Sequence, residues 1–165
     1  MSEACAVRAY RASDLSRMRE IWNEVVRAGR AFPQTDELDE RAAQEFFAAQ
    51  TRTAVAEKDG RVLGLYILHP NNVGRCAHVA NASYAVDAAA RGCGVGRALV
   101  EDSLASLAPC GFRGLQFNAV VASNARAIAL YESLGFTRVG TIPGGFRNAE
   151  GAFEDTIIFY HAAES

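Results

Sequence analysis

The most informative stretch of the chain reads Arg91-Gly92-Cys93-Gly94-Val95-Gly96-Arg97-Ala98-Leu99. A strand-like run, Val79 to Val86, leads into it, and an amphipathic pattern that ends near Ala108 follows it. A glycine-rich turn before a helix exposes consecutive N–H groups at the positive end of the helix dipole, which suits phosphate oxygens. Gly94 and Gly96 can adopt positive φ and let a ligand approach the backbone closely. The alternative is a tight turn without a ligand, because glycine pairs before helices often have that role alone.

A second stretch, Ser123 to Phe136, follows another short apolar run. Together the two stretches resemble the GCN5-related N-acetyltransferase (GNAT) superfamily, and both the order and the spacing of their motifs fit. The acetyl-CoA signature of that superfamily, Arg/Gln-x-x-Gly-x-Gly/Ala, is matched by Arg91, Gly94 and Gly96. Its later signature, Asn-x-x-Ala-x-x-x-Tyr-x-x-x-Gly-Phe, is matched by Asn124, Ala127, Tyr131, Gly135 and Phe136.

The composition predicts one globular domain, residues 1–165, without a nucleic-acid or membrane partner. Of its 165 residues 50% are hydrophobic, so the chain can bury a sizeable core. The net charge of −2 argues against non-specific nucleic-acid binding, which needs a strongly basic face. No apolar run reaches the length that spans a membrane, and Met1 to Cys5 lack the features of a signal peptide.

The cysteines and histidines predict neither a disulfide framework nor a metal site. The four cysteines are widely spaced, form no Cys-x-x-Cys pair and make no zinc pattern with the three histidines. Reduced thiols in a cytoplasmic protein are the simplest interpretation. The sequence does not fix the oligomeric state, and a homodimer stays open.

The remaining patterns predict an α/β fold, a mixed sheet of about six to seven strands with helices on both faces. We expect strands at Ala6–Tyr10, Arg52–Glu57, Val62–Leu68, Val79–Val86, Leu115–Val121, Phe136–Ile142 and Phe153–Tyr160. We expect a first helix that is capped by Ser13 or Asp14 and ends at Gly29, and a second helix over Asp39–Ala49 in which Ala42, Phe46 and Ala49 are apolar. We expect a third helix that begins after Gly94 and stops at Gly111, and a fourth over Asn124–Leu134. We expect turns at Lys58-Asp59-Gly60 and Pro143-Gly144-Gly145.

The resemblance implies acetyl-CoA as the acetyl donor. In the superfamily, the strands corresponding to Val79–Val86 and Leu115–Val121 run parallel and splay apart, and the pantetheine arm enters the gap. This implies hydrogen bonds from the arm to the backbone between Tyr84 and Val86, with Asn124 both capping its helix and holding the arm. We expect backbone amides as the main phosphate contacts, arginines as secondary ones, and an outward Cys93 without chemistry. The loop residues concerned are Arg91, Gly92, Cys93, Gly94, Val95, Gly96 and Arg97.

Acetyl transfer to an amine needs a neutral nucleophile, a donor for the tetrahedral oxyanion and a proton for the departing thiolate, but no metal. Tyr131 is the candidate proton donor, because the resemblance puts this tyrosine beside the thioester sulfur and a phenol is protonated at neutral pH. The alternative is a packed aromatic residue on an apolar helix stripe. The proton acceptor stays open: Val79–Val86 has no carboxylate, which leaves His78, a water relay or an amine that arrives neutral.

Two asparagines, Asn81 and Asn118, interrupt strands that otherwise predict burial. An unpartnered buried carboxamide costs ~1–3 kcal/mol, so each must bond a neighbour, a water or a ligand. They either pin a local bulge or loop, or form a pair of amide donors for a small polar acceptor.

Around these asparagines, His78-Val-x-Asn81 and Phe117-Asn118 resemble the fungal enzymes that acetylate proline analogues such as azetidine-2-carboxylate. Phe32, in the loop Arg30–Leu38, and the turn Pro143–Arg147 are candidate walls of the acceptor site, or ordinary loops.

We therefore expect an acetyl-CoA-dependent N-acetyltransferase acting on a small-molecule amine, with an amino acid or proline analogue as one candidate. A non-catalytic acyl-CoA sensor of the same fold is the first alternative, which the missing carboxylate favours and the retained Tyr131 disfavours. A nucleotide-binding protein is the second, but the chain lacks the Gly-Lys-Ser/Thr of a P-loop and an acidic residue at the Rossmann spacing.

Overall fold

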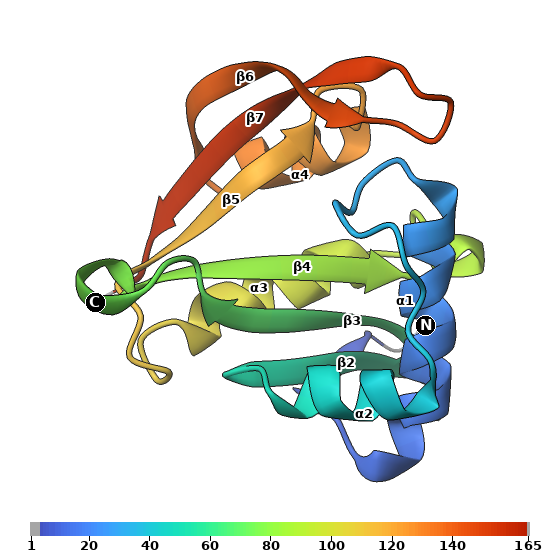
Figure 1. The fold of residues 1–165 in the computed structure, drawn as a ribbon. Helices are drawn as coiled ribbons and strands as arrows, with labels where there is room; N and C mark the ends of the chain where they lie inside the picture. The colour runs from blue at the N-terminus through green and yellow to red at the C-terminus, as the bar shows by residue number, and fades with distance from the viewer. Residues whose placement is uncertain (1–3, 165) are drawn as a thin grey trace.

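The protein folds into a seven-stranded mixed sheet, which confirms the predicted fold class (Figure 1). The computed structural model describes residues 4–164, so part of the N-terminal stretch considered for a signal peptide lies outside it. In order across the sheet the strands are β1 (Ala6–Ala9), β2 (Arg52–Lys58), β3 (Arg61–Pro70), β4 (Val79–Val86), β5 (Gly114–Val121), β7 (Phe153–Ala162) and β6 (Thr137–Arg147). The helices are α1 (Leu15–Ala28), α2 (Glu40–Ala48), α3 (Val95–Ser106) and α4 (Ala125–Ser133).

Strands β4 and β5 run parallel, pair briefly and then diverge, as the resemblance implied (Figure 1). Strand β5 bulges between Phe117 and Val120, where its register with β7 shifts. A bulge bends its strand, which carries β5 away from β4. We call the diverging segments, Asn81–Val86 and Gln116–Val121, the fork. Its closed end is formed by the pairs Val79–Gly114 and Ala80–Leu115.

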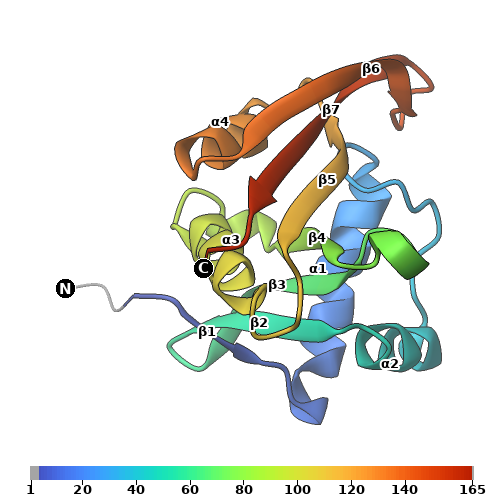
Figure 2. The same ribbon diagram turned by 90° about the vertical axis from the view of Figure 1, so that its left-hand side faces the viewer.

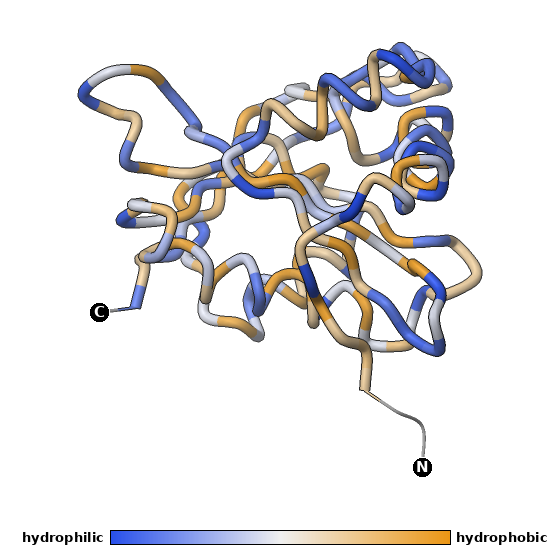
Figure 3. The backbone as a smooth tube through the Cα atoms, turned by 90° about the horizontal axis from the view of Figure 1, so that it is seen from below, coloured by the Kyte–Doolittle hydropathy of each residue, from blue (hydrophilic) through white to orange (hydrophobic). Residues whose placement is uncertain are grey.

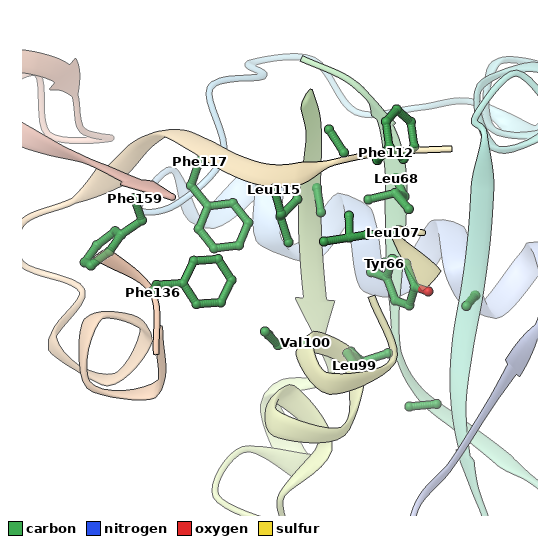
Figure 4. Packing of buried hydrophobic residues seen from close by; sticks show 14 of the residues in the cluster. Tyr66, Leu68, Leu99, Val100, Leu107, Phe112, Leu115, Phe117, Phe136 and Phe159 are labelled. Carbon is green, nitrogen blue, oxygen red and sulfur yellow. The ribbon is translucent and has the colours of Figure 1, made fainter. Parts of the chain in front are cut away.

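Helices α3 and α4 cover one face of the sheet, and α1 and α2 cover the other (Figure 2). On the α3/α4 face, Phe117, Phe136 and Phe159 gather beside β5, β7 and α4 (Figure 4). On the α1/α2 face, Trp22 packs edge-on against Phe47 with ring centroids 5.9 Å apart. Hydrophobic segments run through the interior of the chain trace and hydrophilic ones lie towards the periphery (Figure 3). Burial of a large apolar side chain contributes about 1.5–3 kcal/mol, so the two cores fix both helix layers.

The start of α3 lies close to the sheet because residue 64 of β3 is glycine. A Cβ on Gly64 would lie 3.0 Å from both the Val95 side chain and the Ala85 carbonyl oxygen. The glycine therefore sets how near the first turn of α3 approaches the sheet.

The first two helices differ in detail from the sequence prediction. Asp14 occupies the N-cap position of α1, one of the two predicted, but its side chain accepts no hydrogen bond from the helix, and a 3-10 turn over Ala12–Asp14 precedes it. The Asp14 carboxylate instead accepts from the Arg11 N–H (2.7 Å) and from Arg8 (2.8 Å).

Helix α2 forms where it was predicted, with Asp39 as its N-cap, but its most buried residues differ from the predicted apolar ones. The Asp39 side chain accepts from the Ala42 N–H at 2.7 Å. The helix buries Ala43 and Phe47, and the predicted Phe46 is half-buried and also packs against Trp22, with ring centroids 5.2 Å apart.

One hairpin turn is confirmed and the other is displaced. The β2–β3 hairpin turns at Asp59 and Gly60, both with positive φ, as a tight two-residue hairpin requires. The predicted turn at Pro143-Gly144-Gly145 is wrong, because β6 continues to Arg147 with a register shift between Ile142 and Phe146. Strand β6 ends the sheet, where a proline without an N–H is tolerated.

The tip of the β6–β7 hairpin reaches the end of α1. The Ala149 N–H donates to the Gly29 carbonyl at 3.1 Å, and Arg30 pairs with Glu150 at 3.2 Å. Gly29 ends α1 with φ of 62°, as predicted, and a Cβ there would lie 2.8 Å from that of Ala149. The contact joins the β5–β7–β6 part of the sheet to the α1 layer (Figure 1).

Candidate active site

The glycine loop leads from β4 into α3 through a 3-10 turn, Ala88–Ala90, and the turn 91–94. Gly92 and Gly94 have φ of 80° and 81°, which side-chain-bearing residues rarely adopt. Gly96 lies in the first turn of α3 without a positive φ, so that part of the expectation is wrong. An added Cβ on Gly96 would meet Leu130 of α4 at 3.8 Å.

The loop presents a row of unused backbone donors. The first N–H groups of a helix have no acceptor within it. Within residues 4–164, no oxygen accepts from the N–H groups of Gly94, Val95, Gly96 or Arg97. Four adjacent donors at the positive end of a helix form a site for an anion.

The Asp87 side chain stabilises the 3-10 turn that precedes this loop. Its carboxylate accepts from the Ala89 N–H at 3.1 Å and forms an ion pair with Arg17 of α1. The Ala89 N–H, together with Arg17, holds the pKa of the Asp87 carboxyl below its usual value. The ionised carboxylate thus fixes the 3-10 turn that precedes the donors.

At the closed end of the fork, Asn81 replaces a rung of the β ladder. Its Nδ2 donates to the Gln116 carbonyl oxygen at 2.9 Å. Asn81 and Gln116 follow the last backbone pair of β4 and β5, so the side chain spans the point where the strands part. Asn81 therefore pins the fork, and its Oδ1 has no partner in the described part of the chain.

Tyr131 lies inside the aromatic cluster on the α3/α4 face. Its ring centroid is 4.5 Å from that of Phe117, 5.4 Å from Phe136 and 6.5 Å from Tyr84. Burial raises its pKa above the usual value for a phenol, so the group is protonated at neutral pH. Its hydroxyl makes no hydrogen bond with any residue in 4–164, whereas that of Tyr84 bonds Ser103 at 2.7 Å.

Asn118 is exposed, which corrects the prediction that its strand position is buried. It lies at the β5 bulge and alternates with Phe117 of the core, so its side chain is on the opposite face of the strand. Its Nδ2 donates to Asn71 Oδ1 at 2.6 Å, and its Oδ1 accepts from Gln116 Nε2 at 2.9 Å. The carboxamide is therefore held in one orientation by both neighbours.

Asn124 caps α4 as predicted, with its side chain accepting from the Ala127 N–H at 3.3 Å. Arg91 and Arg97 are exposed beside the loop, and Arg97 bonds Glu101 and Ser133, each at 3.1 Å. Cys93 is exposed, in agreement with the expected outward side chain.

Two predicted acceptor-site residues lie apart from this arrangement. Phe32 is buried in the α1/α2 core, 4.5 Å from the Trp22 ring, and so supports the loop from inside. His78 is exposed in the turn before β4, where its carbonyl accepts from the Arg113 N–H at 2.8 Å. Its side chain makes no hydrogen bond with any of residues 4–164.

The sequence analysis missed Asn71 and Gln116, which complete the polar cluster with Asn81 and Asn118. Gln116 alternates with Leu115 and Phe117 of the core, so alternation places it on the opposite face, with Asn81. Asn71 follows β3 directly, and its N–H donates to the Val79 carbonyl at 2.8 Å. Strand alternation was the signal for Gln116, while Asn71 carried no local signal.

Other features of the described residues, 4–164, add no second centre. No cluster of three or more His, Cys, Asp or Glu side chains there can hold a metal ion. None of the helices in that range is both long and apolar enough to cross a membrane. An open cleft of about 700 Å³ lies along α1 and its following loop, but none of the predicted site residues lines it.

Comparison with known proteins identifies related chains. The sequence model of the acetyltransferase (GNAT) family matches residues 15–136. N-acetyltransferase aca1 from Schizosaccharomyces pombe is 30% identical over 166 residues, which cover 89% of this chain and 79% of that protein. This relative agrees with the predicted resemblance to fungal enzymes.

Solved structures agree in fold. A GCN5-related N-acetyltransferase from Kribbella flavida has a TM-score of 0.89 and 38% identity, covering 96% of this chain and 98% of that one. A GNAT phosphinothricin acetyltransferase from Sinorhizobium meliloti, solved in complex with AcCoA, has a TM-score of 0.90 and 23% identity, covering 98% and 89%. The second likeness is one of fold alone.

Proposed function

The chain belongs to the acetyltransferase (GNAT) family, and from that premise we propose that it transfers the acetyl group of acetyl-CoA to the amine of a small molecule. One observation carries the proposal: an unused row of N–H donors, Gly94 to Arg97, follows the strand that forms one side of an open fork.

The donor would be bound by backbone groups in two places. The N–H groups at the start of α3 suit the diphosphate of CoA, because they combine hydrogen-bond donors with the positive helix end. The pantetheine arm carries amide groups that can pair with a strand edge. The edge of β4 between Tyr84 and Val86, which faces away from β3 and is not paired with β5, offers them partners. Asn124, already oriented by its cap bond, would hold the arm from the β5 side.

Tyr131 would give a proton to the departing CoA thiolate. The proposal rests on a phenol that is protonated at neutral pH and whose hydroxyl is free of protein partners. The apolar surroundings also raise the pKa of the departing CoA thiol. The proton therefore moves between two groups whose pKa values are both raised by burial. The alternative is a purely structural tyrosine, whose ring packs among Phe117, Phe136 and Phe159.

The acceptor would bind on the α1/α2 face at the closed end of the fork. Asn81 and Asn118 supply amide groups there, and the hairpin contact between Ala149 and Gly29 lies at the opposite, open end of the fork. Amide groups at the closed end of the fork suit a small polar amine, such as an amino acid or proline analogue. Phe32 and the strand segment Pro143–Arg147 would support the walls from behind.

The test combines binding with turnover. Acetyl-CoA and CoA should raise the melting temperature, whereas ATP and NAD should leave it unchanged. Thiol release should then be measured with a panel of small amines that includes amino acids, proline and azetidine-2-carboxylate. CoA binding without thiol release from any amine would identify an acyl-CoA sensor, and no CoA binding at all would refute the proposal.

A further inference from the structure

We propose that His69, on β3, is the group that accepts the proton of the attacking amine; the inference rests on the proposed function. His69 stands directly opposite Asn81 in the antiparallel β3–β4 ladder. Directly opposed residues have Cβ atoms about 4.5–5.5 Å apart, so the imidazole lies beside the residue that pins the fork.

Strand alternation puts His69 on the acceptor side. The neighbours Leu68 and Ala80 belong to the α3/α4 core, so His69 and Asn81 lie on the opposite face. Gln116 lies on the same face, and the three side chains form a row across β3, β4 and β5 at the closed end of the fork. The α1/α2 core takes Ile67 from β3 but not His69, which stays partly exposed.

The hydrogen bonding of His69 leaves one ring nitrogen available. Its Nδ1 lies 2.9 Å from the Pro70 carbonyl oxygen, which can act only as an acceptor, so Nδ1 carries the hydrogen. In the neutral ring the lone pair is then on Nε2. No group in residues 4–164 donates to Nε2, so it is free to accept a proton from a ligand.

The groups that face His69 carry no charge of their own. Asn81 from β4 and Gln116 from β5 do not titrate. On the neighbouring strand β2, Arg52 is opposite Leu68, and its guanidinium bonds Tyr66 and Asp102 on the α3/α4 face, away from His69. The site therefore contains one proton acceptor and the unpartnered Oδ1 of Asn81, which can orient an amine N–H but cannot take its proton.

An amine that enters as the ammonium gives one proton to Nε2 of His69, which releases it to solvent. The neutral nitrogen attacks the acetyl carbonyl carbon and forms the C–N bond. As the C–S bond breaks, the nitrogen loses its second proton to solvent, and the thiolate takes the proton of Tyr131, which is replaced from solvent. The products are the acetamide, CoA-SH and one released proton.

The test compares His69→Gln with wild type on two acceptors: the best amino acid or imino acid of the panel, protonated at pH 7, and an arylamine that is already neutral. General-base catalysis contributes about 10²–10⁴-fold, so kcat on the protonated amine should fall at least tenfold, with a smaller loss on the arylamine. If Nε2 of His69 takes the amine proton, the acidic limb of the kcat/KM profile on the protonated amine should disappear in the variant. Imidazole should partly restore His69→Ala.

Acetyl-CoA binding and the melting temperature of both variants serve as folding controls. His78→Gln is assayed in parallel as the competing histidine. Three results would each overturn the inference while wild type still transfers acetyl groups. His69→Gln could lose equal activity on both amines with an unchanged pH profile, or it could lose none. Alternatively, the loss could occur in His78→Gln instead. If wild type releases no thiol with any amine of the panel, the proposed function fails, and the inference about His69 fails with it.

Discussion

Replacing Tyr131 with phenylalanine separates chemistry from packing, because the two roles predict opposite results. The substitution keeps the ring contacts with Phe117 and Phe136, at 4.5 Å and 5.4 Å, and removes a hydroxyl that bonds no residue in 4–164. No partner is left unsatisfied, so the free energy of unfolding should change by less than about 1 kcal/mol. If the hydroxyl protonates the thiolate, kcat should fall at least tenfold, which is about 1.4 kcal/mol of activation free energy.

Tyr66→Phe is the matched control within the same core. The Tyr66 hydroxyl donates to Asp102 at 2.6 Å and accepts from Arg52 at 2.8 Å, so its loss breaks bonds to charged groups. The free energy of unfolding should fall by about 1.5–3 kcal/mol while kcat stays near wild type. Steady-state thiol release, single-turnover rates and urea unfolding of both variants give the comparison. A normal single-turnover rate in Tyr131→Phe would refute the acid role and leave a packing role.

Four further substitutions test other parts of the structure. Gly96→Val adds methyl groups to the first turn of α3, where an added Cβ lies 3.8 Å from Leu130. The Kd for CoA should rise far more than the melting temperature falls, because the ligand approaches the backbone there. An unchanged Kd in the folded variant would contradict the phosphate site. Asn81→Ala and Asn118→Ala should each raise the KM of the amine about ten- to a hundredfold, because one hydrogen bond to a charged group is lost, and should leave the Kd for CoA unchanged. Lower stability with an unchanged KM would show that these side chains stabilise only the sheet. The hydrogen bond from Arg8 holds the pKa of the Asp14 carboxyl below its usual value. The ionised carboxylate therefore stabilises the fold above about pH 4, and this stabilisation is lost as the pH falls further. The difference in unfolding free energy between wild type and Asp14→Asn should accordingly shrink below that pH in urea titrations, and a difference that stays constant would contradict the ion pair.

Residues with local signatures were placed correctly from the sequence. The left-handed Gly94, the cap at Asn124 and the Asp59-Gly60 turn each follow from conformational limits of a few neighbouring residues. Errors arose where a distant segment decided the outcome. Asp14 was expected to cap α1, but the Arg8 guanidinium on β1 and the Arg11 N–H take its carboxylate.

The buried or exposed state of the asparagines shows the same limit. Asn81 and Asn118 interrupt similar apolar strands, yet the first pins the fork while the second is exposed at a bulge. The bulge arises from the register of β5 against β7, which lies far along the chain and has no signature in the β5 sequence itself.

By itself the sequence determined the family, the glycine loop, the order of strands and helices, and Tyr131 on the inner stripe of α4. These depend on spacing along one element, where geometry repeats every two or 3.6 residues. The tertiary structure alone decided which distant side chains share a face of the sheet. Strand pairing set His69 opposite Asn81, and the missing pairs between β4 and β5 opened the fork beside them. Register depends on the packing of both faces at once, and no local pattern records it.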